Sequence, residues 1–184
     1  NQLLAKPGEP LYITLLMVYA YWKEYFSGPY DPSNIARKFK NREEVIAAGG
    51  TTTWTKQEGK PDIPPTFKLA MAANVFIQKP DNLLCEAFSI PIGDKMYTAA
   101  RWTADKQAAA AVLPVIKNDR KLALRDRGIY SGIYELKTVM KKSSGGINYY
   151  VPRLTLTSRH TDDNLKEIER LMGESATIDI NDEN

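Results

Sequence analysis

Basic and aromatic side chains gather in the second half of the chain, in a pattern suited to binding a polyanion. Residues 117 to 159 contain ten basic and three acidic side chains, although the whole chain has a net charge of only +3. Lysine and arginine neutralise phosphates, and aromatic rings stack on unpaired bases. The pattern predicts a surface for single-stranded nucleic acid, foremost DNA. Its expected members are Tyr97, Arg101, Trp102, Arg125, Arg127, Lys137, Lys141, Lys142, Tyr149 and Arg153.

The C-terminal end carries the opposite charge. Residues 160 to 184 hold eight acidic and two basic side chains, and several of the acids lie between Ile178 and Glu183. This run is similar to the acidic tails of single-stranded DNA-binding proteins, which lie on the basic groove or recruit partner proteins. The same carboxylates could instead neutralise the basic segment within the fold.

Residues for catalysis are scarce. The chain has one histidine, His160, and one cysteine, Cys85, which are too few for a zinc site built from these residue types. No glycine-rich phosphate-binding motif or nucleophile motif occurs. A magnesium site of Asp162, Asp163 and Glu167 stays open and would indicate a metal-dependent nuclease, but these residues are also typical of a helix start. We therefore expect a binding protein rather than an enzyme, with no cofactor.

The composition is that of an ordinary globular protein, with 43% hydrophobic and 26% charged residues. One cysteine excludes an intrachain disulfide and fits a reducing, cytoplasmic compartment. The most hydrophobic run, residues 11–22, is shorter than the roughly 20 apolar residues that cross a bilayer. We expect no membrane partner.

The elements that must position these side chains fall into four regions. The first, residues 1–50, is predicted to form an N-terminal helical layer. The first helix is indicated by apolar residues that recur at helical spacing, namely Leu11, Leu15, Val18, Trp22 and Phe26. Asp31-Pro32 and Asn41 are typical starts of two shorter helices. Three short helices also fit a helix-turn-helix with the basic edge Arg37, Lys38, Lys40 and Arg42. Alternatively, the apolar first helix serves protein–protein assembly, including homo-oligomers.

Residues 51–65 predict a loop or linker, because they are rich in threonine, glycine and proline. Trp54 lies in this loop, where it either packs back onto the core or forms a platform for a ligand. Residues 66–173 predict an α+β domain, and residues 174–184 a flexible acidic tail.

The α+β region has the order of elements of an OB-fold, a five-stranded barrel with an inserted helix. Strands are predicted over 67–77, 84–92, 95–102, 129–141 and 147–159, with a helix over 103–113 that Pro114 kinks or ends. Thr161 caps a C-terminal helix that stops at Gly173. The alternative is an unclassified α+β sandwich.

The register of the last hairpin can be predicted as well. Leu136 and Leu154 share a face only if the connecting loop has an odd number of residues, such as three or five. Loops of these lengths usually need a glycine in the left-handed region, which Gly145 or Gly146 supplies.

Overall fold

The computed structural model describes residues 8–26, 31, 33–81, 83, 85–143 and 145–176. Its elements, in chain order, are β1 (Leu11–Glu24), β2 (Lys38–Phe39), α1 (Arg42–Ala47), β3 (Phe67–Gln78), β4 (Ile90–Ile92), β5 (Lys95–Asp105), α2 (Gln107–Lys121), the 3-10 turn η1 (Ile129–Ser131), β6 (Gly132–Lys142), β7 (Asn148–Arg159) and α3 (Asp162–Ala176). Within these residues, seven strands form one antiparallel sheet in the order β4-β5-β3-β1-β6-β7, with β2 beside β1.

The expected N-terminal helix is wrong, because residues 11–24 form strand β1 at the centre of the sheet. A bulge between Leu15 and Met17 shifts the register against β3 by one residue. Leu15 lies opposite Val75 before the bulge, and Val18 lies opposite Ala73 after it. On one face of the strand, the apolar side chains therefore have odd residue numbers before the bulge and even numbers after it. The resulting spacing of three residues between Leu15 and Val18 resembles that of a helix.

The second expected helix is also wrong, and with it the helix-turn-helix. In the described part of residues 31–41 the regular element is β2, which pairs with the end of β1 through Trp22 and Phe39. The third helix is confirmed as α1, and the Asn41 side chain caps it by accepting a hydrogen bond from the Glu44 N–H.

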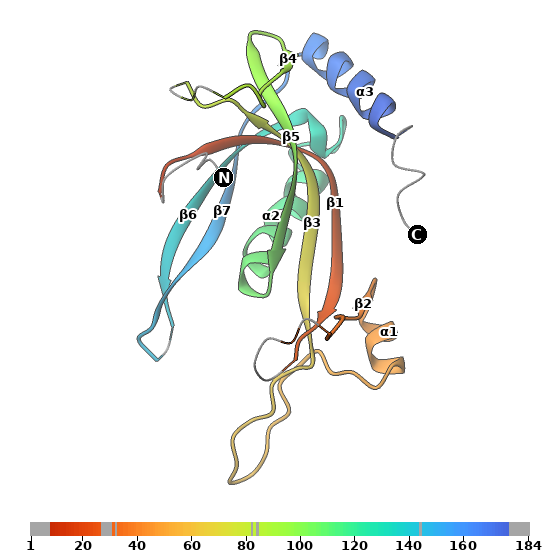
Figure 1. The fold of residues 1–184 in the computed structure, drawn as a ribbon, viewed down its shortest axis with the longest axis vertical. Coiled ribbons are helices and arrows are strands. Elements are labelled where there is room, and N and C mark those ends of the chain that lie inside the picture. The colour runs from red at the N-terminus through yellow and green to blue at the C-terminus, as the bar shows by residue number, and fades with distance from the viewer. Residues whose placement is uncertain are drawn as a thin grey trace.

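The OB-like barrel is wrong as well, because the sheet stays open between β4 and β7 at its two ends. Within the described part of the chain, the β6–β7 hairpin pairs with β1 along Leu11–Thr14 and then diverges from it. Figure 1 shows the result as two arms, one made of β1, β3 and β5 and the other of β6 and β7. The cause is β1, which lies between β3 and β6 and so separates strands that a barrel would join.

Helix α2 lies between the two arms and contacts β3, β5 and β7 (Figure 1). Ala109 and Val112 of α2 are fully buried in the main core, together with Leu15, Met71 and Tyr134. The helix begins at Gln107 rather than Thr103, since β5 continues its ladder with β3 as far as Asp105. It also continues through Pro114, so the prediction that this proline ends the helix is wrong, while the predicted kink stays a prediction.

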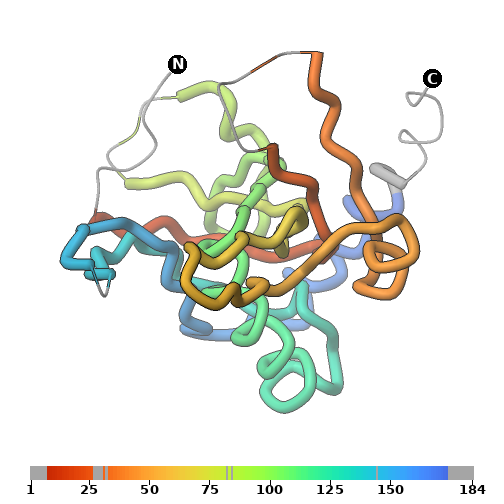
Figure 2. Tube along the Cα trace, turned by 90° about the horizontal axis from the view of Figure 1, so that it is seen from below, coloured from red at the N-terminus to blue at the C-terminus, as the bar shows by residue number. Residues whose placement is uncertain are grey.

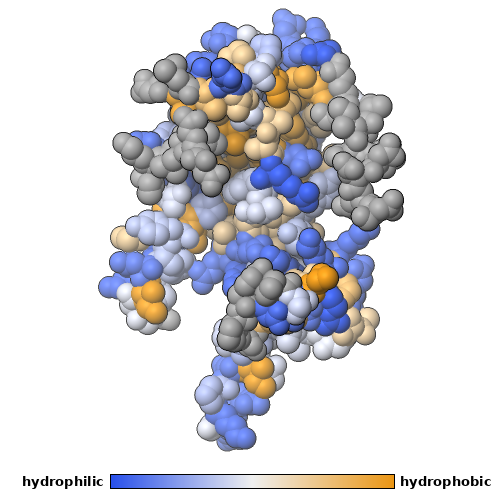
Figure 3. All heavy atoms as spheres, viewed as in Figure 1, coloured by the Kyte–Doolittle hydropathy of each residue, from blue (hydrophilic) through white to orange (hydrophobic). Residues whose placement is uncertain are grey.

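Helix α3 covers the upper end of the opposite sheet face. Ile168 of α3 is fully buried in a second core with Phe76, Ile92 and Tyr97. As predicted, Thr161 caps the helix, accepting a hydrogen bond from the Asn164 N–H at 3.3 Å. Figure 3 shows apolar side chains at the upper end of the visible face and mostly hydrophilic ones lower down. Residues 177–184, most of the expected acidic tail, lie outside the described residues.

The predicted register of the last hairpin is confirmed. Leu136 lies opposite Leu154, and Lys142 opposite Asn148, which leaves the odd-length loop 143–147. Gly146 has φ of 79°, the left-handed conformation that such a loop requires.

Candidate functional site

Four of the ten predicted binding residues share one face of the β6–β7 hairpin. Lys137 lies opposite Arg153, and Lys141 lies opposite Tyr149. Lys137 also forms an ion pair of 2.9 Å with Glu135 on its own strand. Lys142 is exposed and points to the other face, since strand side chains alternate.

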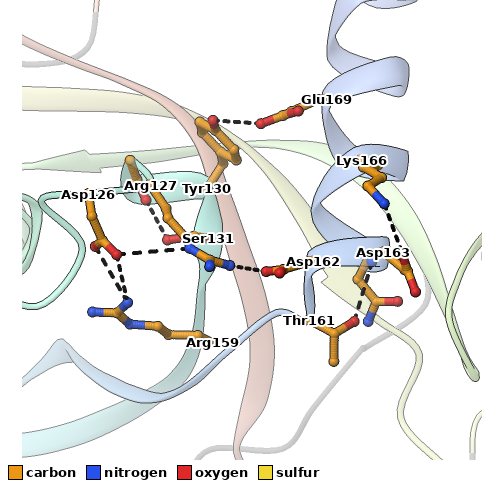
Figure 4. Close-up of polar contacts among 12 residues, drawn as sticks. Asp126, Arg127, Tyr130, Ser131, Arg159, Thr161, Asp162, Asp163, Lys166 and Glu169 are labelled. Carbon is orange, nitrogen blue, oxygen red and sulfur yellow. Dashed lines mark hydrogen bonds and ion pairs between the residues drawn. The ribbon is translucent and has the colours of Figure 1, made fainter.

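Arg125 and Arg127 lie at the opposite end of this hairpin, in the turn that follows α2. Arg127 forms ion pairs with Asp126 and with Asp162 at the start of α3, as Figure 4 shows. Arg159 pairs with Asp126 in the same network. Two basic residues of the predicted polyanion segment are therefore neutralised by carboxylates, one of them from the last helix.

The three predicted residues on β5 are also dispersed. Tyr97 is 3% exposed and lies beneath α3, with its ring centroid 6.5 Å from that of His160. Burial raises the pKa of Tyr97, which fits a core residue. Trp102 packs against the main core, and Arg101 is exposed opposite Asn74. The ten residues do not form one continuous surface.

A different set of aromatic and basic residues does meet in one place. An open hollow of about 690 Å³, here called the arm groove, lies between the lower ends of the two arms, at the start of α2. Figure 2 shows this end of the molecule from below, with the blue β6–β7 hairpin on one side of the loop of residues 51–66 and α1 on the other. The side chains relevant to binding are those of Trp22, Trp54, Lys68, Lys106, Tyr149 and Tyr150.

Each aromatic side chain of the arm groove has a different structural support. Trp22 lies near the end of β1, between Leu69 of β3 and Phe39 of β2. Trp54 is 61% exposed in the loop, so it does not pack back onto the core. Tyr149 and Tyr150 are consecutive in β7, which is the edge strand of the sheet, so the hollow reaches both faces of that strand.

The loop that carries Trp54 is held by pairing near its tip and at its base. Thr55 and Ile63 exchange two backbone hydrogen bonds of 3.0 and 2.9 Å. At the base, the Thr51 N–H donates to the Thr66 hydroxyl at 2.8 Å, and the Thr66 N–H donates to the Thr51 hydroxyl at 3.1 Å. Trp54 is thus presented on an ordered turn beside the groove.

Positive charge enters the arm groove from Lys68, Lys106 and the start of α2. Gln107 and Ala108 line the hollow, and the side chain of the N-cap residue Lys106 makes no capping hydrogen bond. The N-terminus of a helix carries about half a positive charge. Among the described residues, neither Lys68 nor Lys106 has a carboxylate within 4.0 Å.

Asp105 lies beside these lysines, and its carboxylate already accepts hydrogen bonds from two other residues. Its carboxylate accepts hydrogen bonds from Lys23 at 3.0 Å and from the Tyr25 hydroxyl at 2.7 Å. Burial raises the pKa of Asp105, but the bonds from Tyr25 and Lys23 outweigh it and hold the pKa below its usual value. The pKa of Tyr25 is raised mainly by burial and, to a smaller extent, by the hydrogen bond to Asp105. At neutral pH the carboxylate is ionised and the phenol is neutral.

Sequence reasoning found only part of the arm groove. Tyr149 was predicted, and Trp54 was recognised as a possible platform because it is a large aromatic residue in a polar loop. Trp22 was assigned to an apolar helix stripe, while Lys68 and Lys106 gave no local signal. These three residues come together because β1 pairs with β3. The prediction of a helix over residues 11–26 excluded that pairing.

The acidic residues at the start of α3 do not assemble into a metal site. Asp162 pairs with Arg127, Asp163 with Lys166 and Glu167 with Arg170. The described part of the chain contains no group of three or more His, Cys, Asp or Glu residues arranged to hold a metal ion. None of the helices in that part is both long enough and apolar enough to span a bilayer.

Comparison with known proteins gives no relative on which to base a function. No family model, no curated protein and no solved structure matches the chain.

Proposed function

We propose that this protein binds single-stranded nucleic acid in the arm groove. The observation that carries the proposal is the convergence of two tryptophans and two tyrosines with Lys68, Lys106 and the uncapped start of α2 around one open hollow. Stacking of one base on an aromatic ring contributes about 1–3 kcal/mol, so a few rings suffice for useful affinity. The lysines and the helix terminus supply charge for the phosphates.

The exposure of the rings favours a single strand over a duplex. Tyr150 is 64% exposed and Trp54 is 61% exposed, so both can offer a ring face to an unpaired base. In a duplex the base faces are already stacked on one another and cannot reach such rings. Lys141, opposite Tyr149 on β7, extends the positive charge along the hairpin.

The proposal is tested by fluorescence anisotropy with a labelled oligothymidine and with a duplex of the same length. We expect the single strand to bind more tightly and its affinity to fall as salt is added. Trp54→Ala should weaken binding by about 1–3 kcal/mol. Arg125→Ala removes an exposed charge outside the groove and serves as the control. Equal, negligible binding by the wild type toward both oligonucleotides would refute the proposal.

A second candidate function, association with another protein, is favoured by the exposed apolar side chains of β1. Tyr19 is 52% exposed and Met17 is 43% exposed on this strand. Light scattering of the wild type and of Tyr19→Ser over a range of concentrations tests it. Assembly that weakens in the variant supports this function, and a monomer at every concentration excludes self-association. For either function, the lone cysteine leads us to propose a cytoplasmic location.

A further inference from the structure

Three lysine side chains surround the ring of Tyr25 beside the arm groove. Their ammonium nitrogens lie 4.2 Å (Lys106), 5.3 Å (Lys68) and 5.8 Å (Lys23) from the ring centroid. Lys23 and Lys68 are cross-strand partners on β1 and β3, and Lys106 follows the last residue of β5. The sheet thus concentrates like charges at one end of three adjacent strands, an arrangement that is unfavourable without a counter-charge.

The residues that the structure describes supply only part of that counter-charge. Asp105 bonds to Lys23 and to the Tyr25 hydroxyl and also attracts Lys106, but its single negative charge balances only one of the three positive charges. Lys68 and Lys106 contact the Tyr25 ring face, and no described carboxylate lies within ion-pair distance of either. The cluster of Lys23, Tyr25, Lys68, Asp105 and Lys106, here called the Tyr25 cluster, therefore keeps a formal excess of two positive charges.

The backbone of Lys106 gives a second, independent indication. Lys106 has φ of 54° and ψ of −119°, and no other described non-glycine residue has a positive φ. This conformation is strained for a side chain with a Cβ atom, and such strain is concentrated at functional sites. Its N–H still donates to the Leu69 carbonyl at 2.8 Å, which fixes the residue where β5 meets α2. A glycine would fit without strain, yet the position carries a lysine.

We infer that the Tyr25 cluster is the binding site for a phosphate group of the bound strand, an inference that rests on the proposed function for the identity of the strand. Lys68, Asp105 and Lys106 belong to the arm groove as well as to the cluster, so a phosphate held here is continuous with bases stacked on the groove's aromatic rings. An internal phosphodiester carries one negative charge and a terminal phosphate up to two, and either fits the excess charge. Lys23 and Asp105 orient Tyr25, whereas Lys68 and Lys106 contact the phosphate.

The test compares the salt dependence of oligothymidine binding between the wild type and the double variant Lys68→Gln/Lys106→Gln. Each phosphate contact contributes a slope of about −0.7 to the plot of log affinity against log salt for single strands. Because both lysines contact the same phosphate, we expect the slope to flatten by about 0.7 in the double variant. The matched control is Lys117→Gln/Lys121→Gln, which removes the same charge from exposed positions near the other end of α2 and should keep the wild-type slope. Far-UV circular dichroism verifies that each variant is folded.

Two further arms separate the possible outcomes. Oligonucleotides with and without a terminal phosphate show which phosphate of the strand is bound. If the wild type prefers the phosphorylated oligonucleotide and the double variant does not, the cluster binds a terminal phosphate. If the wild type binds both oligonucleotides equally, the cluster binds an internal phosphate. Inorganic pyrophosphate, titrated while the Lys106 backbone N–H is followed by NMR, probes the cluster without any base. Wild-type slope and affinity in the double variant would overturn the phosphate site while leaving the proposed function intact. If pyrophosphate shifts the NMR signal of the Lys106 N–H but no oligonucleotide binds, the phosphate site is supported and the proposed function is refuted.

Discussion

His160 should make the stability of this protein depend on pH below about 6.5, the unperturbed pKa of histidine. It is the one histidine of the chain and is 5% exposed. Its Nε2 lies 2.7 Å from the Thr14 hydroxyl, and its buried Nδ1 has no hydrogen-bond partner among the described residues. A protonated ring would need an acceptor at both nitrogens. Burial therefore lowers the pKa of His160 from 6.5.

The sign and size of the effect follow from linkage. Below pH 6.5 the unfolded chain binds a proton at this residue more readily than the folded protein does, so stability present at pH 7.5 is lost as pH falls. The loss amounts to at most about 1.4 kcal/mol for each pH unit below 6.5 over which the folded ring stays neutral. Carboxylates with lowered pKa, such as Glu24 and Asp126, lose their contribution at lower pH. Burial raises the pKa of Asp119, which gives the opposite sign.

Urea denaturation of the wild type and of His160→Gln at pH 7.5, 6 and 5 measures this contribution. Glutamine can keep a hydrogen bond to Thr14 but does not titrate, so the variant should lose little stability between pH 6.5 and 5. The wild type should lose up to about 1.4 kcal/mol per pH unit over the same interval. If both proteins lose stability equally, the buried histidine is not the cause and the reasoning fails.

Three further substitutions test packing and strain, each by urea denaturation at neutral pH. Gly132→Ala places a Cβ atom 2.8 Å from side-chain carbons of Leu124 and Leu156 and should cost about 1–3 kcal/mol; an unchanged midpoint would mean that this core is loosely packed. Lys106→Gly removes the strain of a positive φ and should raise the free energy of unfolding by about 0.5–1 kcal/mol, whereas a decrease would show that the lysine contacts outweigh the strain. Ile168→Ala empties a fully buried position between α3 and the sheet and should cost about 2–5 kcal/mol, and a smaller loss would show that α3 is weakly attached.

Local features of the fold could be predicted from the sequence where one short segment contains the whole signal. The cap at Thr161 and the odd loop before Asn148 each depend on a few adjacent residues. The central strand could not be predicted in this way, because the bulge after Leu15 gives β1 the apolar spacing of a helix. An error in this one element also changed the predicted topology from an open sheet to a barrel.

The candidate site was harder to predict for the same reason. Its members come from β1, the loop of residues 51–66, β3, the β5–α2 junction and β7. They meet only once β1 is placed between β3 and β6. The density of positive charge along the sequence indicated a binding surface in residues 117–159. In the structure, however, Arg127 forms an ion pair with Asp162, and Arg159 forms one with Asp126. Local charge density therefore identified a region rich in cations but not Lys68 and Lys106, the lysines that line the arm groove.

The narrow connection between the two arms makes α2 the spacer that sets the width of the site. Among the described residues, the hairpin is hydrogen-bonded to the rest of the sheet along Leu11–Thr14 alone, while α2 contacts both arms. A smaller side chain at the buried Val112 would let the arms approach, and a larger one would spread them. Recognition in the groove is thus adjustable from the hydrophobic interior, by residues that no ligand touches.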